Sequence, residues 1–165
     1  MAAETEKMMS EVKTTHHTVT LTRSYDATVE RVFAAWRDTA RLARWYVPGD
    51  GSWESDVVEH DFRVGGRKHL TFGPKGGPRY VEDCRYEDIV DGRRICFSMT
   101  IAGEKARMTT SMVTVELAAN GARTDLKVTD QLVVLDGSDG PANARDREAG
   151  WSETIGKLPA ELARG

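Results

Sequence analysis

Hydrophobic residues follow two different periods near the start of the chain, and each period predicts a different element. Over residues 17–24, Val19 and Leu21 alternate with polar residues, which is typical of a strand with one buried face. Directly afterwards, hydrophobic residues recur at i, i+3, i+4 and i+7, which predicts a helix with one apolar stripe. The stripe consists of Val29, Val32, Phe33 and Trp36. Asp26 or Thr28 can cap this helix, and a second short helix is expected to follow it.

Strand-like stretches fill the middle of the chain, and a last helix follows them. The stretches cover approximately residues 54–62, 67–72, 79–90, 93–101, 108–117 and 122–134. Later hydrophobic residues are spaced as one helix stripe, beginning at about Ala142. The stripe consists of Trp151, Ile155, Leu158 and Leu162. Pro159 lacks a backbone donor, so a kink or an early end is expected there.

The dipeptide Asp91-Gly92 predicts a tight hairpin between two of these strands. With a two-residue turn, Val90 faces Arg93, and Tyr86 then pairs with Phe97. The same register places Cys84 and Cys96 on opposite faces of the sheet. A disulfide between them is therefore not expected.

A second hairpin is predicted at Asn120-Gly121. In the register expected from this turn, Val115 faces Leu126 and Glu116 faces Asp125. One face of this strand pair is apolar and the other is polar, which favours an antiparallel sheet with one solvated side. The whole order of elements predicts an α+β fold, in which a curved antiparallel sheet of about six to seven strands wraps around a long C-terminal helix.

Composition changes this picture only at the margins. Residues 1–15 are polar and are expected to form a disordered leader before a single domain over residues 16–165. The formal charge of −3 and the absence of a basic stripe argue against nucleic acid as a partner. No secretory signal and no apolar run long enough to span a membrane is present, so a cytoplasmic protein is expected. Arginine outnumbers lysine, 16 to 7, which suggests a bacterial source.

Four sequence features together resemble one superfamily. They are the segment Ala27–Trp36, Trp45, the motif Asp61-x-Arg63-x-Gly65-Gly66, and Gly150-Trp151. The set resembles the SRPBCC (START-like) superfamily and, within it, the branch of the activator of the heat shock protein 90 ATPase. The resemblance covers about residues 17–163. It implies a helix-grip (START/Bet v-like) fold with two short helices after the first strand and a hydrophobic ligand cavity between the sheet and the C-terminal helix.

The implied cavity gives a set of candidate ligand-binding residues. They are Trp36, Trp45, Asp61, Arg63, Tyr86, Phe97, Met99 and Trp151. Aromatic residues on a helix stripe are more often plain core, and this is the simpler interpretation of the tryptophans. For Asp61 and Arg63 the simpler interpretation is an ion pair that braces a turn.

Catalytic residues cannot be assigned from the sequence. Glu82 and Asp83 are acid–base candidates, although a charged stretch of this kind more often forms a solvated strand face. His60 and His69 flank the double glycine, but the chain lacks the usual metal-ligand spacings, so neither a metal nor another cofactor is expected. The glycine-rich segment 73–78 is expected to be a mobile loop and not a phosphate cradle.

Three functions remain open from the sequence. The first is a small stand-alone protein that binds a hydrophobic or lipid-like molecule in the cavity. The second is an enzyme similar to polyketide cyclases or hydratases, with an acid or a base in the cavity. The third is a chaperone-cofactor or stress role, which the resemblance implies and which is weakened because co-chaperone relatives carry a separate N-terminal domain. A homodimer is expected only because homo-oligomers are common among soluble proteins.

Overall fold

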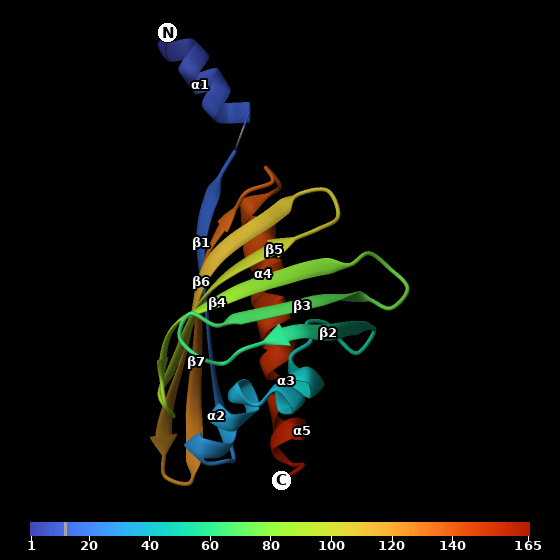
Figure 1. Ribbon diagram of the computed structural model, residues 1–165. Helices are drawn as coiled ribbons and strands as arrows, with labels where there is room; N and C mark the ends of the chain where they lie inside the picture. The colour runs from blue at the N-terminus through green and yellow to red at the C-terminus, as the bar shows by residue number, and fades with distance from the viewer. Residues whose placement is uncertain (12) are drawn as a thin grey trace.

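The computed structural model describes residues 1–11 and 13–165 and contains one antiparallel sheet, with the helices that follow the first strand packed against one face (Figure 1). The sheet has seven strands in the order β1-β7-β6-β5-β4-β3-β2. The strands are β1 (Thr15–Tyr25), β2 (Trp53–His60), β3 (Arg67–Pro74), β4 (Tyr80–Val90), β5 (Arg94–Ala102), β6 (Arg107–Asn120) and β7 (Arg123–Val134). The helices are α1 (Ala2–Glu11), α2 (Val29–Arg37), α3 (Thr39–Trp45), α4 (Gly140–Ile155) and α5 (Leu158–Leu162). This helix-grip arrangement confirms the predicted fold class.

A short helix precedes the first strand. Helix α1 covers Ala2–Glu11, and β1 already begins at Thr15. Residues 1–7 are exposed, so α1 does not depend on burial of their side chains. Ala, Glu and Lys are strong helix formers, which favours a helix in this segment.

The first helix after β1 begins as predicted, with Thr28 as its cap. The Thr28 side chain accepts a hydrogen bond from the backbone N–H of Arg31. The hydrophobic stripe of α2 faces the core, where Val32, Phe33 and Trp36 are buried. Helix α3 follows at once, and α2 and α3 together place the chain at one end of the sheet (Figure 1).

The hairpin between β4 and β5 has a longer turn than predicted. Val90 faces Arg94, not Arg93, because three residues form the turn, with Gly92 at φ +69°. A bulge between Tyr86 and Asp88 then compensates for the extra residue. Tyr86 consequently still faces Phe97, as predicted, and Cys84 and Cys96 are both free.

The hairpin between β6 and β7 is shifted by two positions from the predicted register. Asn120 pairs with Arg123, so the turn consists of residues 121–122. Glu116 faces Lys127, whereas the predicted register placed it opposite Asp125. Opposite charges across strands are favourable and like charges are not, which gives a physical reason for the observed choice. The shift is even, so the buried face is unchanged.

The final helix is interrupted close to its predicted break. Helix α4 is capped by Asp139, whose side chain accepts from the backbone N–H of Ala142 at 2.8 Å. It ends at Ile155, and α5 starts after a turn, with Pro159 in its first turn. Proline is tolerated there because those N–H groups have no helical acceptor. All four residues of the predicted stripe are buried.

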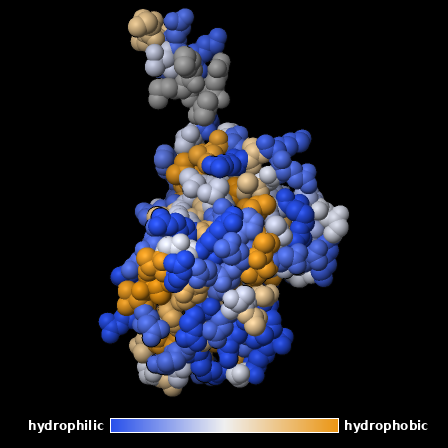
Figure 2. All heavy atoms as spheres, viewed as in Figure 1, coloured by the Kyte–Doolittle hydropathy of each residue, from blue (hydrophilic) through white to orange (hydrophobic). Residues whose placement is uncertain are grey.

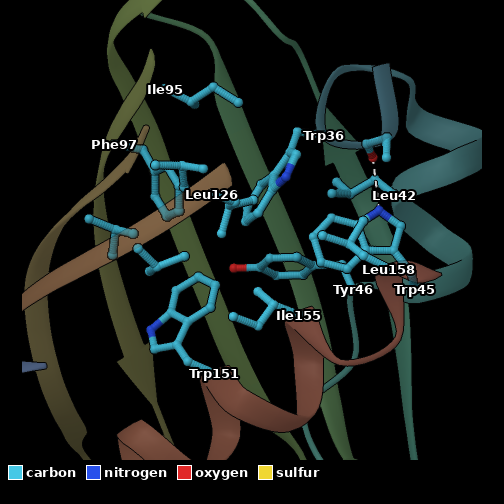
Figure 3. Packing of buried hydrophobic residues seen from close by; sticks show 14 of the residues in the cluster. Trp36, Leu42, Trp45, Tyr46, Ile95, Phe97, Leu126, Trp151, Ile155 and Leu158 are labelled. Carbon is cyan, nitrogen blue, oxygen red and sulfur yellow. Dashed lines mark hydrogen bonds between the residues drawn. The ribbon is translucent and has the colours of Figure 1, made fainter. Parts of the chain in front are cut away.

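The hydrophobic core lies between the sheet and helices α2 to α5 (Figure 3). The view in Figure 2 shows mainly polar residues on the surface, with apolar residues in separate patches. Among the described residues, no helix has the length and apolar character needed to cross a bilayer.

Candidate functional site

A cavity of about 540 Å³ lies between the sheet and α4. Residues of β3, β4, β5 and β6 form one wall, and residues 143–154 of α4 take part in the opposite wall. The segment 46–53, which joins α3 to β2, also lines the cavity. The cavity therefore lies where the helix-grip arrangement leaves the sheet and helix separated.

Part of the cavity wall is aromatic. The ring centroid of Trp53 lies 6.1 Å from that of Phe72 and 6.0 Å from that of Tyr80. All three residues line the cavity, together with Met99 and Trp151. Such a wall offers a large apolar contact area to a ligand.

A buried polar cluster interrupts the apolar wall. The Glu82 carboxylate oxygen Oε1 lies 3.0 Å from the Lys68 ammonium and accepts hydrogen bonds from the Tyr46 hydroxyl at 3.0 Å and the Cys84 thiol at 3.3 Å. The side chains of Lys68 and Glu82 are 1% and 6% exposed. Tyr46 and Glu82 line the cavity, and Lys68 and Cys84 lie behind them.

Electrostatics fix the protonation of the three donors. Burial is the largest influence and would lower the pKa of Lys68, but the Glu82 carboxylate together with Tyr46, Cys84 and Tyr86 outweighs it and holds that pKa well above its ordinary value. Burial, followed by the same carboxylate, raises the pKa of Tyr46 well above its ordinary value. Burial also raises the pKa of the Cys84 thiol. Lys68 is therefore charged and the other two donors are neutral. The Lys68 ammonium also lies 3.9 Å from the centroid of the Tyr46 ring, a favourable cation–π contact.

A second buried carboxylate, Asp130 on β7, lies behind two residues that line the cavity, Arg147 and Trp151. Asp130 Oδ2 accepts hydrogen bonds from Arg147 at 2.8 Å and from the Trp151 indole N–H at 2.9 Å. Asp130 Oδ1 is buried without a partner in the described part of the chain. Arg147 also donates to Thr109 at 2.6 Å. This network fixes the Trp151 ring against the cavity and pairs the charge of Arg147.

The segment 46–53 is held by a lysine from the turn between α4 and α5. The Lys157 ammonium donates to the backbone carbonyls of Val47 and Gly49, the latter at 2.6 Å. Gly49 has φ +92°, and a Cβ there would lie 2.6 Å from the Trp53 ring. Glycine is therefore required for the chain to pass so close to this aromatic wall.

The predicted ligand-binding residues divide into three groups in the structure. Met99 and Trp151 line the cavity. The other aromatic residues pack in the core beside it: Trp36, Trp45, Tyr86 and Phe97. Figure 3 shows Trp36, Trp45 and Phe97 among the buried side chains, and the ring centroids of Trp36 and Trp45 are 4.8 Å apart. The Trp45 indole donates to the backbone carbonyl of Ala35. The surroundings of these four residues are those of ordinary core residues, and contact between these residues and a ligand stays a prediction.

The third group, Asp61 and Arg63, lies on the turn between β2 and β3. The two side chains form an ion pair at 2.7 Å, and they are 43% and 68% exposed. Gly65 has φ +82°, and a Cβ on Gly66 would lie 2.0 Å from the carbonyl oxygen of Asp61. Only Gly65 therefore needs the left-handed conformation, whereas Gly66 is required by a close backbone approach. Neither charged residue lines the cavity.

The histidines near this turn have protein partners. His60 lies 2.9 Å from the Tyr86 hydroxyl and 2.9 Å from the Thr39 hydroxyl. Burial, followed by the charge of Lys68, lowers the pKa of His60 to about 4. His69 lies near Asp83, 3.4 Å from its carboxylate. Over residues 1–11 and 13–165, no three His, Cys, Asp or Glu side chains form a group suited to a metal ion.

Sequence reasoning placed Glu82 on a solvated strand face, and this interpretation was wrong. Glu82 is buried, whereas its neighbour Asp83 is exposed. The signal was present, because Cys84 and Tyr86 were already assigned to the apolar face and residues two apart share a face of a strand. The same rule, applied from the hydrophobic residue Leu70, places Lys68 on the same buried face of its strand. The run of charged letters obscured this alternation.

The sheet, the helix across it and the intervening cavity define a helix-grip protein of the SRPBCC superfamily. More narrowly, the chain belongs to the family of activator of Hsp90 ATPase homolog 1-like proteins, whose model matches residues 26–163. The resemblance found in the sequence is thereby confirmed. No curated protein matches the chain.

Solved structures with the same fold come from several bacteria. The Mll3558 protein from Rhizobium loti is 36% identical, with a TM-score of 0.76 over 90% of this chain and 99% of that one. An uncharacterised protein from Rhizobium leguminosarum is 28% identical, with a TM-score of 0.78 over 93% and 98%. The CV1439 protein from Chromobacterium violaceum is 29% identical, with a TM-score of 0.73 over 88% and 96%.

Proposed function

We propose that this protein binds an apolar small molecule in the cavity between the sheet and α4. The cavity of about 540 Å³ carries this proposal, because its volume lies in the usual range for small-molecule sites. Its wall combines a large aromatic area with a few buried polar groups, which is the composition typical of such sites. Met99 and Trp151 are the predicted ligand contacts that this proposal retains as cavity wall.

Gly150 provides a way to fill the cavity without disturbing the fold. It lines the cavity from α4, and a Cβ placed on it would meet no atom within 4 Å. A larger side chain there would project into space that a ligand needs. Replacing a glycine inside a helix also favours the helix, by about 1 kcal/mol.

The test measures binding of N-phenyl-1-naphthylamine, a neutral fluorescent apolar probe, to the Gly150→Leu variant. We expect the variant to bind at least about tenfold more weakly than the wild type, while its thermal stability is unchanged or higher. Glu148→Leu is the matched control, because Glu148 is exposed on the same helix and does not line the cavity. No probe binding to the wild type, or equal binding by both variants and the wild type, would contradict the proposal.

Native mass spectrometry of freshly purified protein complements this test. A co-purifying molecule that denaturation releases would give the chemical class of the natural ligand. Its loss in Gly150→Leu, but not in Glu148→Leu, would place that molecule in the cavity.

A second candidate is an enzyme of the cyclase or hydratase type, and one observation favours it. The cavity wall contains a buried carboxylate, Glu82, at hydrogen-bonding distance from the Tyr46 hydroxyl. Paired groups of this kind can transfer a proton to or from a bound molecule. Incubating the protein with the co-purified molecule in deuterated water tests this role. Exchange of a carbon-bound hydrogen in the wild type but not in Glu82→Gln would support catalysis, and no exchange in either would favour a carrier.

A further inference from the structure

Glu82 is distinguished from the other acidic residues around the cavity by its burial. Asp50, Asp146 and Glu153 also line the cavity, but all three are exposed to solvent. Only Glu82 among these four presents a carboxylate that water does not surround. A ligand that enters the cavity must therefore either leave this carboxylate to its protein partners or hydrogen-bond to it.

The partners of Glu82 all approach one of its oxygens. The shortest contact of the Lys68 ammonium, and the hydrogen bonds from the Tyr46 hydroxyl and the Cys84 thiol, are all to Oε1. No hydrogen bond from the described residues to Oε2 is found. The carboxylate is thus held rigidly by three donors, while its second oxygen retains its capacity to accept. An ionised carboxylate accepts and cannot donate, so a ligand group that pairs with it must be a donor.

Charge also restricts the ligand. Lys68 balances Glu82, and Arg147 balances Asp130 at 2.8 Å, so the buried charges near the cavity cancel in pairs. A second carboxylate, such as that of a fatty acid, would lie against Glu82 without a free cation on that wall. A neutral molecule avoids this repulsion.

A buried ion pair is also a poor choice for stability alone. Removing two charges from water costs several kcal/mol per ion, and apolar residues of similar volume often give equal or greater stability. The position of the pair at the cavity wall, and not elsewhere in the core, is explained if it serves recognition.

We infer that Glu82 is the polar anchor of the cavity, and that it selects neutral apolar molecules carrying a hydroxyl group. Lys68, Tyr46 and Cys84 position its carboxylate, and the aromatic wall of Trp53, Phe72 and Tyr80 contacts the apolar body. This inference rests on the proposed function and adds the chemical class of the ligand. A site built to pair with a hydroxyl discriminates strongly against an analogue that lacks it.

Two probes of nearly equal size test the inference: 2-naphthol and 2-methylnaphthalene. The methyl compound is the more hydrophobic of the two, so an apolar cavity without an anchor should not prefer 2-naphthol. We expect the wild type to bind 2-naphthol at least about tenfold more tightly, because a hydrogen bond to a charged group is strong in a buried site. Titration followed by tryptophan fluorescence or calorimetry gives both affinities.

The decisive variant is Lys68→Met/Glu82→Leu, which removes both charges and leaves neither one buried alone. We expect it to bind both probes with similar affinity. Glu148→Gln is the control, because this carboxylate is exposed on α4 and does not line the cavity, and it should retain the preference. Equal binding of the two probes by the wild type would overturn the inference and leave cavity binding intact. Persistence of the preference in the double variant would also overturn it, since the anchor would lie elsewhere. Failure of the wild type to bind 2-naphthol, 2-methylnaphthalene and N-phenyl-1-naphthylamine would overturn cavity binding itself, and the inference with it.

Discussion

Replacing either member of the buried Lys68–Glu82 pair should destabilise the protein, and the two replacements should have opposite pH dependences. Lys68→Met leaves a carboxylate at a position where only 6% of the side chain is exposed. Glu82→Leu leaves an ammonium of which 1% is exposed. In each case the remaining group can escape the cost of a lone buried charge by becoming neutral.

The cost of neutralisation sets the expected magnitude. Protonating Glu82 at pH 7, against an ordinary pKa near 4.3, costs about 4 kcal/mol. Deprotonating Lys68 at pH 7, against an ordinary pKa near 10.4, costs about 5 kcal/mol. These figures are ceilings for the charge effect in each single variant, and they agree with the roughly 3–5 kcal/mol usual for breaking a buried pair. Lys68→Met also loses the ammonium contact with the Tyr46 ring, at 3.9 Å.

The pH dependences follow from which group is left. In Lys68→Met a lone buried carboxylate is disfavoured in its charged form, so the loss of stability grows as pH rises above about 4.3. In Glu82→Leu the folded-state pKa of Lys68 is depressed, so the loss grows as pH falls below about 10.4. Each slope should approach about 1.4 kcal/mol per pH unit. Lys68→Met/Glu82→Leu should show neither slope and should recover most of the lost stability.

Denaturant unfolding followed by tryptophan fluorescence at about pH 5, 7 and 9 measures these free energies relative to the wild type. The chain has four tryptophans, and Trp36, Trp45 and Trp151 are buried, so the signal reports the core. Losses below about 1 kcal/mol in both single variants, without a pH slope, would refute the reasoning. Such a result would show that water reaches both groups.

Three further predictions concern other parts of the molecule. The pKa of His60 is lowered to about 4 in the folded protein, against an ordinary 6.5, so its contribution to stability is fully present above about pH 6.5 and is lost as pH falls toward 4. The loss should be on the order of 2 kcal/mol, because His60 is only partly buried. Denaturant unfolding of the wild type and of His60→Gln between about pH 4 and 7 measures it, and the same pH dependence in both proteins would contradict the prediction. Trp151→Ala should cost about 3–5 kcal/mol in denaturant melts, since the ring is 5% exposed and hydrogen-bonded to Asp130, and a loss under about 1 kcal/mol would show a peripheral ring. Gly66→Ala should destabilise the fold by more than about 3 kcal/mol, because its Cβ would lie 2.0 Å from a backbone oxygen. Gly76→Ala, with φ +72° but open space, should cost only about 1–2 kcal/mol, and similar melting temperatures for the two variants would contradict this account.

Hydrophobic periodicity was sufficient to predict the strands of the sheet, the helix after the first strand and the C-terminal helix. The alternation of Val19 and Leu21 and the stripe ending at Trp36 depend on neighbours within a turn or two, so the sequence alone specifies them. The face of each strand was also predictable, because a strand has a period of two residues. Tyr86 and Phe97 therefore face each other as expected, even though the turn beside them has an additional residue.

Strand register and the polar part of the site required the tertiary structure. Glu116 pairs with Lys127. This choice could not be predicted from either strand alone, because charges on separate strands interact only when the strands lie side by side. Likewise, Lys68 and Glu82 lie on different strands, and Tyr46 lies after a helix, so their convergence on one carboxylate oxygen depends on the order of strands in the sheet.

The sequence by itself determined the class of fold, the family and the hydrophobic faces that are buried, since these depend on local periods and on spaced motifs. The tertiary structure decided which of those buried residues line a cavity and which only fill the core. Met99 and Phe97 illustrate the difference, because they share a strand and a face, yet only Met99 lines the cavity. The reason is physical: a cavity is space left where α4 lies away from the sheet, and that separation is set by the packing of all the elements together.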